Sequence, residues 1–210
     1  MADAPCAYQR TQSMAELAPP LVKLLAISGS LRKASVNTKI LETVADSDLL
    51  NAHAVIDVIV LTDVPLYNED LDLEVPPPAV QALRDSIRFA DGVIISTPEY
   101  NHGLPGVLKN ALDWASRPQG QSCLAGKPVL SLSASPAFTG GVRAQAQLNE
   151  TLIAVGAQLV PRAQIVIGGA SEQVSATRLM NEATLNFVID GVRDLLRVIE
   201  RNRHAQYQEA

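Results

Sequence analysis

A short polar loop, Ser28 to Thr38, has the residue types of a phosphate-binding turn. It follows an apolar run and leads into a helical pattern, so the free N–H groups at the start of that helix would face an anion held there. Gly29 permits a tight turn, and Arg32 offers a charged donor. The short hydrogen-bonding side chains are Ser30, Ser35, Asn37 and Thr38. An ordinary strand-to-helix turn capped by Ser or Asn fits the same residues equally well.

Two familiar nucleotide motifs are excluded at this loop. A dinucleotide fingerprint needs two further glycines at fixed spacing, and a P-loop needs Gly-Lys-Ser or Gly-Lys-Thr at the helix start. Neither pattern follows Gly29. A phosphate bound here would therefore belong to another class of ligand.

A second polar loop runs from Thr97 to Gly106 and also leads into a helical pattern. Its prolines and glycines shape the turn, whereas Glu99, Tyr100 and Asn101 are polar groups that a core-directed turn does not need. A flat heteroaromatic ring could lie against Tyr100 and the main chain. A lone loop histidine such as His102 is more often a solvated or capping residue than a general acid.

A third loop, Ser133 to Arg143, is rich in hydroxyl groups and glycine. Ser133 and Ser135 do not form a Gly-x-Ser-x-Gly elbow, and no Asp–His pair is evident to activate them. A serine hydrolase is therefore excluded. We expect this loop to complete a pocket rim with hydrogen-bond donors and a closely approaching main chain.

Five apolar runs rich in Val, Ile and Leu supply the strands that would position these loops. The runs do not alternate with polar residues, which is typical of parallel strands covered on both faces. They are Val22–Ile27, Val55–Leu61, Gly92–Ser96, Pro128–Leu132 and Leu159–Ile167.

Helical patterns separate these strands. Their apolar positions begin near Ile40, Val80, Leu104, Leu148 and Leu185, with Pro76–Pro78 starting the second and Gly156 capping the fourth. This alternation predicts a doubly wound parallel sheet with helices on both faces, because a barrel needs about eight such units. Ligands of open α/β sheets bind at strand exits where the strand order reverses, which is where we expect the three loops.

The composition excludes several classes of protein. The 210 residues, 47% of them hydrophobic, suit one globular domain. A net charge of −5 without a Lys/Arg cluster argues against a nucleic-acid partner. No apolar run approaches the roughly 18 residues of a membrane span. Cys6 and Cys123 are too few and too far apart for a disulfide framework or a zinc site, which favours the cytoplasm.

The ends of the chain and one acidic segment lie outside this pattern. Residues 1–20 lack the apolar region of a secretory signal, so we expect a flexible N-terminal extension, a domain over 21–203 and a tail over 204–210. Asp63 to Glu74 is acidic but has no glycine for a calcium-loop turn, which predicts a solvated loop.

The three loops together resemble the NADPH-dependent FMN reductase family, which includes bacterial chromate and quinone reductases. The resemblance rests on Gly29-Ser30-Leu31-Arg32 with Ser35 and Asn37, on Pro98-Glu99-Tyr100-Asn101 with Leu108 to Trp114, and on Gly126-Lys127-Pro128 with Gly140 to Gln145. It covers about residues 21 to 200. It implies a flavodoxin-like five-stranded sheet of order 2-1-3-4-5, with FMN as cofactor and NADPH or NADH as hydride donor.

The resemblance also implies where FMN binds. The first loop would hold the phosphate through Ser30, Leu31, Arg32, Ser35, Val36 and Asn37. The second would contact the ring and ribityl chain through Pro98, Glu99, Tyr100 and Asn101, and the third would approach the ring through Ser133, Ala134 and Ser135. The chemistry would then take place on the flavin, without a catalytic side chain or a metal.

Further expectations follow from the same resemblance. The partner is a small-molecule electron acceptor such as a quinone, chromate or a flavin, and the protein forms a homodimer or homotetramer. The alternatives are a flavodoxin-like electron carrier and a non-catalytic FMN-binding protein.

Overall fold

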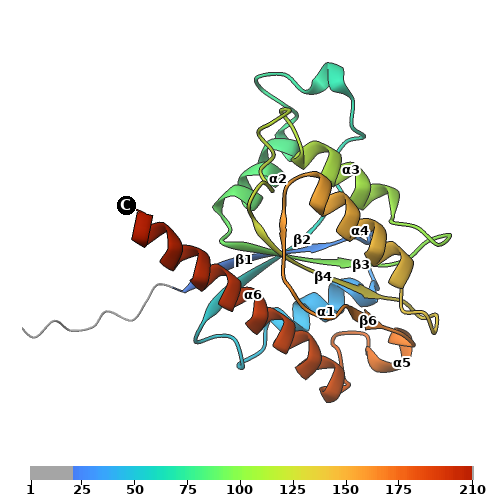
Figure 1. Cartoon of the computed structure of the whole chain (residues 1–210). Helices are drawn as coiled ribbons and strands as arrows, with labels where there is room; N and C mark the ends of the chain where they lie inside the picture. Colours follow the sequence, from blue (N-terminus) through green and yellow to red (C-terminus); the bar gives the residue numbers. More distant parts are fainter. Residues whose placement is uncertain (1–20, 210) are drawn as a thin grey trace, which may run out of the picture.

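The computed structural model describes residues 21–209, so the predicted N-terminal extension, residues 1–20, lies outside the described residues. A parallel sheet forms the centre of the molecule (Figure 1). Its strands are β1 (Val22–Ser28), β2 (Ala54–Val60), β3 (Gly92–Thr97), β4 (Pro128–Ala134) and β5 (Gln158–Leu159), in the order β2-β1-β3-β4-β5. The predicted order 2-1-3-4-5 is confirmed. The order reverses between β1 and β3, so the loops after these two strands diverge from a common point.

The helices cover both faces of the sheet, as predicted. On one face lie α2 (Pro78–Phe89), α3 (Gly106–Ala115) and α4 (Val142–Ala154). On the other lie α1 (Val36–Ala45), the short α5 (Ala170–Gln173) and α6 (Glu182–Glu209), as Figure 1 shows. The helix α6 continues through residues 204–209, the segment assigned to a tail from the sequence.

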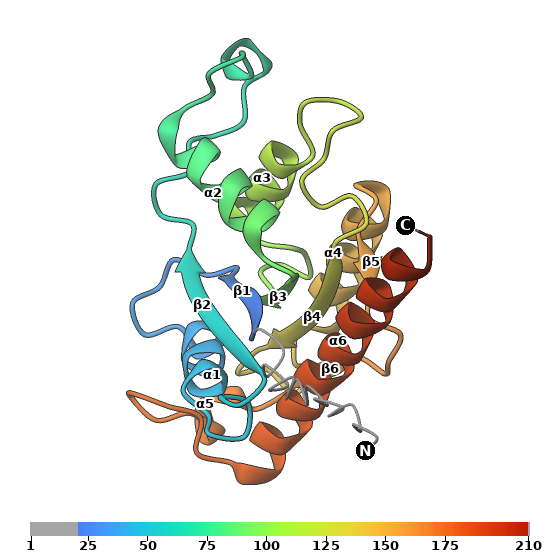
Figure 2. The ribbon, with the colours of Figure 1, turned by 90° about the vertical axis from the view of Figure 1, so that its left-hand side faces the viewer.

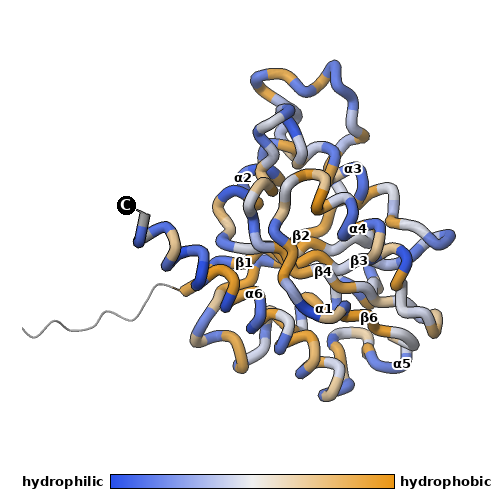
Figure 3. The backbone as a smooth tube through the Cα atoms, in the orientation of Figure 1, coloured by the Kyte–Doolittle hydropathy of each residue, from blue (hydrophilic) through white to orange (hydrophobic). Residues whose placement is uncertain are grey.

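Two apolar cores lie on the two faces because successive strand residues point to opposite sides. In β1, Leu24 and Ala26 pack into the core beneath α1 and α6, whereas Leu25 and Ile27 pack into the core beneath α2, α3 and α4. Figure 3 shows the hydrophobic segments gathered along the central strands. All six residues of β3 are buried, which explains why the strand is apolar up to Ser96 and Thr97 at its end.

The predicted fifth strand, Leu159–Ile167, is wrong as one continuous element. The structure has two short strands there: β5 pairs with the start of β4, and β6 (Ile165–Ile167) pairs with its end (Figure 2). Leu159 lies opposite Val129 and Ile165 opposite Leu132, so the outer chain carries extra residues between the two pairings. Pro161 lies among them and has no N–H to donate to β4, which favours the break.

The acidic segment after β2 is only partly the solvated loop that its composition predicts. It protrudes from the body above α2 and α3 and contains a single 3₁₀ turn, Glu69–Leu71 (Figures 1 and 2). Asp72, however, is nearly buried and accepts a hydrogen bond of 2.8 Å from Arg84 of α2. Arg84 is 3% exposed, and a guanidinium buried to that degree requires a partner of opposite charge.

The helix ends agree closely with their sequence signals. Pro78 opens α2 at its first position, and Gly156 follows α4 with φ of +81°. Leu104 lies before α3 instead of within it, because Pro105 is the N-cap residue of that helix. Within residues 21–209, no helix has the length and apolar character needed to span a bilayer.

We predict that Gly140→Ala destabilises the protein more than Gly120→Ala. Both glycines have positive φ, +61° and +77°, so both variants bear the conformational cost of a side chain there. A Cβ at Gly140 would also lie 2.5 Å from Val166 Cγ1 and 2.9 Å from the Gly168 nitrogen, whereas Gly120 has nothing within 4 Å. Overpacking should therefore lower the free energy of unfolding of Gly140→Ala by about 1–3 kcal/mol more than that of Gly120→Ala. Equal losses in urea unfolding would contradict this account.

Candidate functional site

The three loops named from the sequence meet at the carboxyl ends of β1, β3 and β4. The Gly29 nitrogen donates to the Ser96 carbonyl oxygen over 2.8 Å, which joins the first loop to the end of β3. A Cβ at Gly29 would lie 2.9 Å from Leu108 Cδ2 and 3.1 Å from that same oxygen. Glycine is therefore required because two strand exits and α3 approach one another here.

The side chain of Asn37 fastens all three segments together. Its Nδ2 donates to the Ala134 carbonyl oxygen over 3.0 Å, and its Oδ1 accepts from Ser96 Oγ over 2.7 Å. The residue is 1% exposed. Both ends of the amide are thus bonded within the chain, and what Asn37 leaves for a ligand is its main-chain N–H.

The serines of the first loop shape the turn. Ser35 is the N-cap residue of α1 and accepts from the Thr38 nitrogen over 3.3 Å, and Ser30 Oγ accepts from the Arg32 nitrogen over 3.3 Å. Capping and anion binding are compatible, because the N–H groups of Val36 and Asn37 lie in the first helical turn, where no helical acceptor exists. That turn contains no acidic residue, and Leu31 to Ala34 are exposed.

The second loop folds into a tight turn between Tyr100 and Gly103. These two residues exchange both main-chain hydrogen bonds, at 3.2 and 2.9 Å. The central residues, Asn101 and His102, have φ of 49° and 63°, as a type I′ turn requires. Positive φ is uncommon outside glycine, although Asn and His adopt it more often than most residues, and the two hydrogen bonds hold both residues in this conformation at an exposed tip.

Two predicted residues of the second loop are not free to reach outward. Pro98 is buried, and the Glu99 side chain is 8% exposed with its carboxylate bonded to the start of α4. Tyr100, in contrast, is 49% exposed. The loop therefore offers the Tyr100 ring and main-chain groups to a ligand.

The third loop buries the residues that the sequence singled out. Ser133 Oγ donates to Gln145 Oε1 over 3.3 Å, and Ser135 Oγ accepts from the Ala137 nitrogen over 3.2 Å. Ala134 is fully buried, with its carbonyl oxygen bonded to Asn37. The exposed part of the loop is Pro136 to Thr139.

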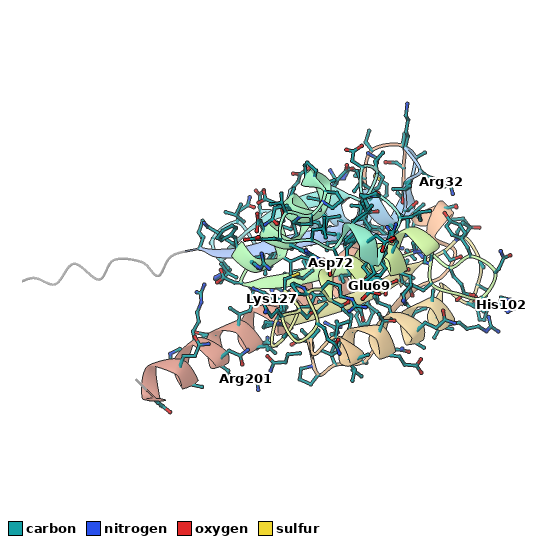
Figure 4. The ribbon with its side chains drawn as sticks, turned by 90° about the horizontal axis from the view of Figure 1, so that it is seen from above. Arg32, Glu69, Asp72, His102, Lys127 and Arg201 are labelled. Carbon is teal, nitrogen blue, oxygen red and sulfur yellow. The ribbon has the colours of Figure 1, made fainter. Side chains whose placement is uncertain are left out.

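Cationic side chains surround this edge of the sheet. Arg32 and Lys33 are exposed in the first loop, and Arg143 is exposed at the start of α4. Figure 4 shows Arg32 and His102 at one side of the molecule and Lys127 and Arg201 at the other. Cations around the mouth favour an anionic ligand even though the whole chain carries a net charge of −5.

Comparison with known proteins identifies this arrangement. Residues 22–172 match the NADPH-dependent FMN reductase family. The chain belongs to that family. A quinone reductase of Pseudomonas putida is 37% identical over 162 residues, which are 77% of this chain and 86% of the relative. An NAD(P)H-dependent FMN reductase of Pseudomonas aeruginosa is 37% identical over 183 residues, 87% of this chain and 97% of that protein.

A solved structure supports the same assignment. The flavoenzyme NAD(P)H:(acceptor) oxidoreductase FerB of Paracoccus denitrificans superposes with a TM-score of 0.73 at 33% identity, covering 86% of this chain and 98% of that one. These findings confirm the predicted flavodoxin-like fold, the FMN cofactor with NAD(P)H as donor, and the enzyme class, an FMN-dependent NAD(P)H oxidoreductase.

The donor set of this FMN reductase fits the phosphate of FMN. A phosphate monoester needs several N–H donors and a positive charge. The first turn of α1 and the Arg32 guanidinium provide both, without a nearby carboxylate in that turn. The main chain at Gly29 packs so closely against the neighbouring strand exit and α3 that there is no room for a Cβ, which holds the loop in place beside the first turn of α1.

Three further residues of the site were not assigned from the sequence. Ser96 and Gln145 bond to predicted site residues, and Phe138 is 97% exposed on the third loop. A serine that ends an otherwise apolar strand is a signal for Ser96, since a buried hydroxyl needs a partner. Gln145 lies in the quoted family motif, but its bonding to β4 depends on how α4 docks.

Outside the three loops, the described residues include one cysteine, Cys123. Among residues 21–209, no group of three His, Cys, Asp or Glu side chains is arranged to hold a metal ion. Burial raises the pKa of the Cys123 thiol, and the nearby Arg88 and Arg84 oppose this only in part. Cys123 thus stays protonated at neutral pH and is a poor nucleophile.

We predict that Asn37→Asp destabilises the fold and weakens FMN binding. Aspartate cannot donate to the Ala134 carbonyl oxygen, and it places a buried charge between two strand exits. The cost should reach about 3 kcal/mol or more, as expected for a buried charged group without its partners. Exposed Asn181→Asp is the control, because the Asn181 side chain only accepts, from the Thr184 nitrogen, and this variant should change stability by less than about 0.5 kcal/mol. Chemical unfolding and flavin titration measure the two effects. If Asn37→Asp left both the free energy of unfolding and the FMN affinity unchanged, Asn37 would not hold the three loops together.

Proposed function

We propose that this FMN-dependent oxidoreductase transfers reducing equivalents from NAD(P)H to a quinone. The observation that carries the proposal is the meeting of three loops at the reversal point of the sheet, tied by Asn37 and facing the open first turn of α1. Relatives named quinone reductase, 37% identical to this chain, support the choice of acceptor.

Each loop has a distinct role in this proposal. Arg32 and the main-chain N–H groups of Val36 and Asn37 bind the FMN phosphate, while Ser30 and Ser35 hold the turn in shape. The second loop, Pro98 to Asn101, contacts the flavin ring through Tyr100 and its main chain. The third loop, Ser133 to Ser135, approaches through its main chain, because its side chains are bonded inward.

The chain's own residues bind and orient the reactants. When bound, FMN supplies the hydride-transfer chemistry, so no side chain of the protein needs to act as a nucleophile. NAD(P)H and the acceptor occupy the same exposed side of the site in turn, which gives a ping-pong order. The cations Arg32, Lys33 and Arg143 favour the approach of the anionic nicotinamide nucleotide.

The rim also has an apolar component that suits a flat acceptor. Leu31 and Tyr100 are each 49% exposed, and Phe138 is 97% exposed. Apolar and aromatic side chains around a mouth with a few charged groups are typical of sites for planar organic ligands. Chromate, a small inorganic anion, would use the cations but not these residues, so we favour a quinone.

We further propose a homodimer or homotetramer that works in the cytoplasm, where NAD(P)H is available. The protruding loop after β2 exposes Leu66, Leu73 and Val75 at 82%, 65% and 84%. Exposed apolar side chains concentrated on one projecting segment are typical of a contact surface. Sedimentation of the full chain tests this: a strict monomer at micromolar concentration rejects it.

The function predicts steady-state turnover of the purified protein. With FMN bound, NADPH or NADH oxidation should depend on a benzoquinone and give parallel lines in double-reciprocal plots, because donor and acceptor occupy the site in turn. Chromate serves as the comparison acceptor. Flavin binding with no NAD(P)H oxidation under any acceptor would instead indicate an electron carrier or a non-catalytic FMN-binding protein.

A further inference from the structure

The Glu99 carboxylate joins the second loop to the helix that follows the third. Its Oε2 accepts from the main-chain nitrogens of Arg143 and Ala144, over 3.0 and 3.2 Å. Its Oε1 lies 3.5 Å from Arg143 Nη1, and the side chain is 8% exposed. We infer that Glu99 is a positioning residue that fixes the third loop for FMN and lowers the reduction potential of the bound flavin. The inference rests on the proposed function.

The start of α4 lacks a cap of its own. Its N-cap residue, Gly141, has no side chain to offer, and its first turn contains no acidic residue. Helix N-termini are stabilised by an acceptor for their free N–H groups and by a nearby negative charge. Glu99 supplies both from a different loop. The second loop therefore provides the N-terminal cap of α4, the helix that follows the third loop.

Close packing adds to this joint. A Cβ at Gly141 would lie 3.2 Å from Ser133 Cβ and 3.5 Å from Glu99 Cβ, so the main chain of the third loop passes directly against both residues. On the side of β4, Gln145 donates to the Ser131 carbonyl oxygen over 3.1 Å and accepts from Ser133 Oγ. The start of α4 is thus held by Gln145 on one side and by Glu99 on the other. Removing the carboxylate releases one of these two restraints.

The same carboxylate places a fixed negative charge next to residues that would contact the flavin ring. Reduction adds electrons to the ring, and a nearby negative charge opposes any increase of negative charge there. The α4 dipole and Arg143 offset this effect in part without removing it. Neutralising Glu99 therefore shifts the reduction potential of bound FMN to a more positive value.

Two substitutions separate the bonding role from the charge. Glu99→Gln keeps an oxygen that can accept from the α4 nitrogens but removes the charge, whereas Glu99→Ala removes both. Asp72→Asn is the matched control, because Asp72 is also a nearly buried carboxylate, 10% exposed and paired with Arg84, but follows the 3₁₀ turn of the protruding loop after β2.

Amide exchange on the protein without flavin tests the joint directly. Glu99→Ala should speed exchange in the peptide that contains Arg143 and Ala144, and Glu99→Gln should restore most of the protection. Because this measurement needs no cofactor, it remains informative even if wild-type protein fails to bind FMN, a result that would reject the proposed function alone. Unchanged amide exchange of this peptide in Glu99→Ala would contradict the claim that Glu99 holds the start of α4.

Flavin titration and potentiometry test the consequence for the cofactor. Glu99→Ala should weaken FMN binding about tenfold, or about 1.4 kcal/mol, because the third loop is no longer held in place for the flavin, and Glu99→Gln should bind within about twofold of wild type. Glu99→Gln should raise the midpoint potential, and Asp72→Asn should not. If Glu99→Ala fails to fold, the inference is tested by comparing the midpoint potential of bound FMN in Glu99→Gln with that in Asp72→Asn. Equal potentials in wild type and Glu99→Gln, or equal losses of affinity in Glu99→Gln and Glu99→Ala, would overturn the inference.

Discussion

The buried amide of Asn37 is the interaction on which the site depends. It bonds to the ends of β3 and β4 from the first turn of α1, so one side chain sets the separation of three loops. Neither of its partners could be replaced by water at 1% exposure, and a buried donor or acceptor left unpaired costs about 1–3 kcal/mol. The sheet brings the three strand exits to one edge, and Asn37 holds them in register there.

The loops are shaped by their own polar side chains, which leaves the main chain for the ligand. Ser30 and Ser35 bond within the first loop, Glu99 bonds to α4, and Ser133 bonds to Gln145. What faces outward is Arg32, the free N–H groups of α1 and the exposed rings of Tyr100 and Phe138. Such a site is preorganised, because its donors are fixed before a ligand arrives.

The sequence predicted the parts of the molecule that depend on local pattern. Continuous apolar runs located the central strands, and Pro78 and Gly156 marked helix ends, because these signals act through neighbouring residues. The break of the outer strand near Pro161 and the burial of Asp72 against Arg84 depend on pairing with distant elements, which no local pattern specifies.

The same limit applies within the site. The sequence pointed to Asn37 and Glu99 as polar residues of the right loops. The direction in which each side chain bonds depends on distant partners: the partner of Asn37 is in β4, 97 residues further along the chain, and that of Glu99 is in α4, 44 residues further along. Polar residues near a ligand either touch it or hold the groups that do. Only the folded arrangement distinguishes these two cases.

The central claim is that the first loop and the start of α1 bind the phosphate of FMN, and calorimetric titration of the flavin-free protein tests it most directly. FMN and riboflavin share the ring and ribityl chain but differ in the phosphate. Two or more charge-assisted hydrogen bonds to the phosphate predict that FMN binds at least about a hundredfold more tightly than riboflavin. Arg32→Gln should reduce this difference by weakening FMN binding, with the affinity for riboflavin unchanged. Equal affinities of wild-type protein for FMN and riboflavin would contradict the account.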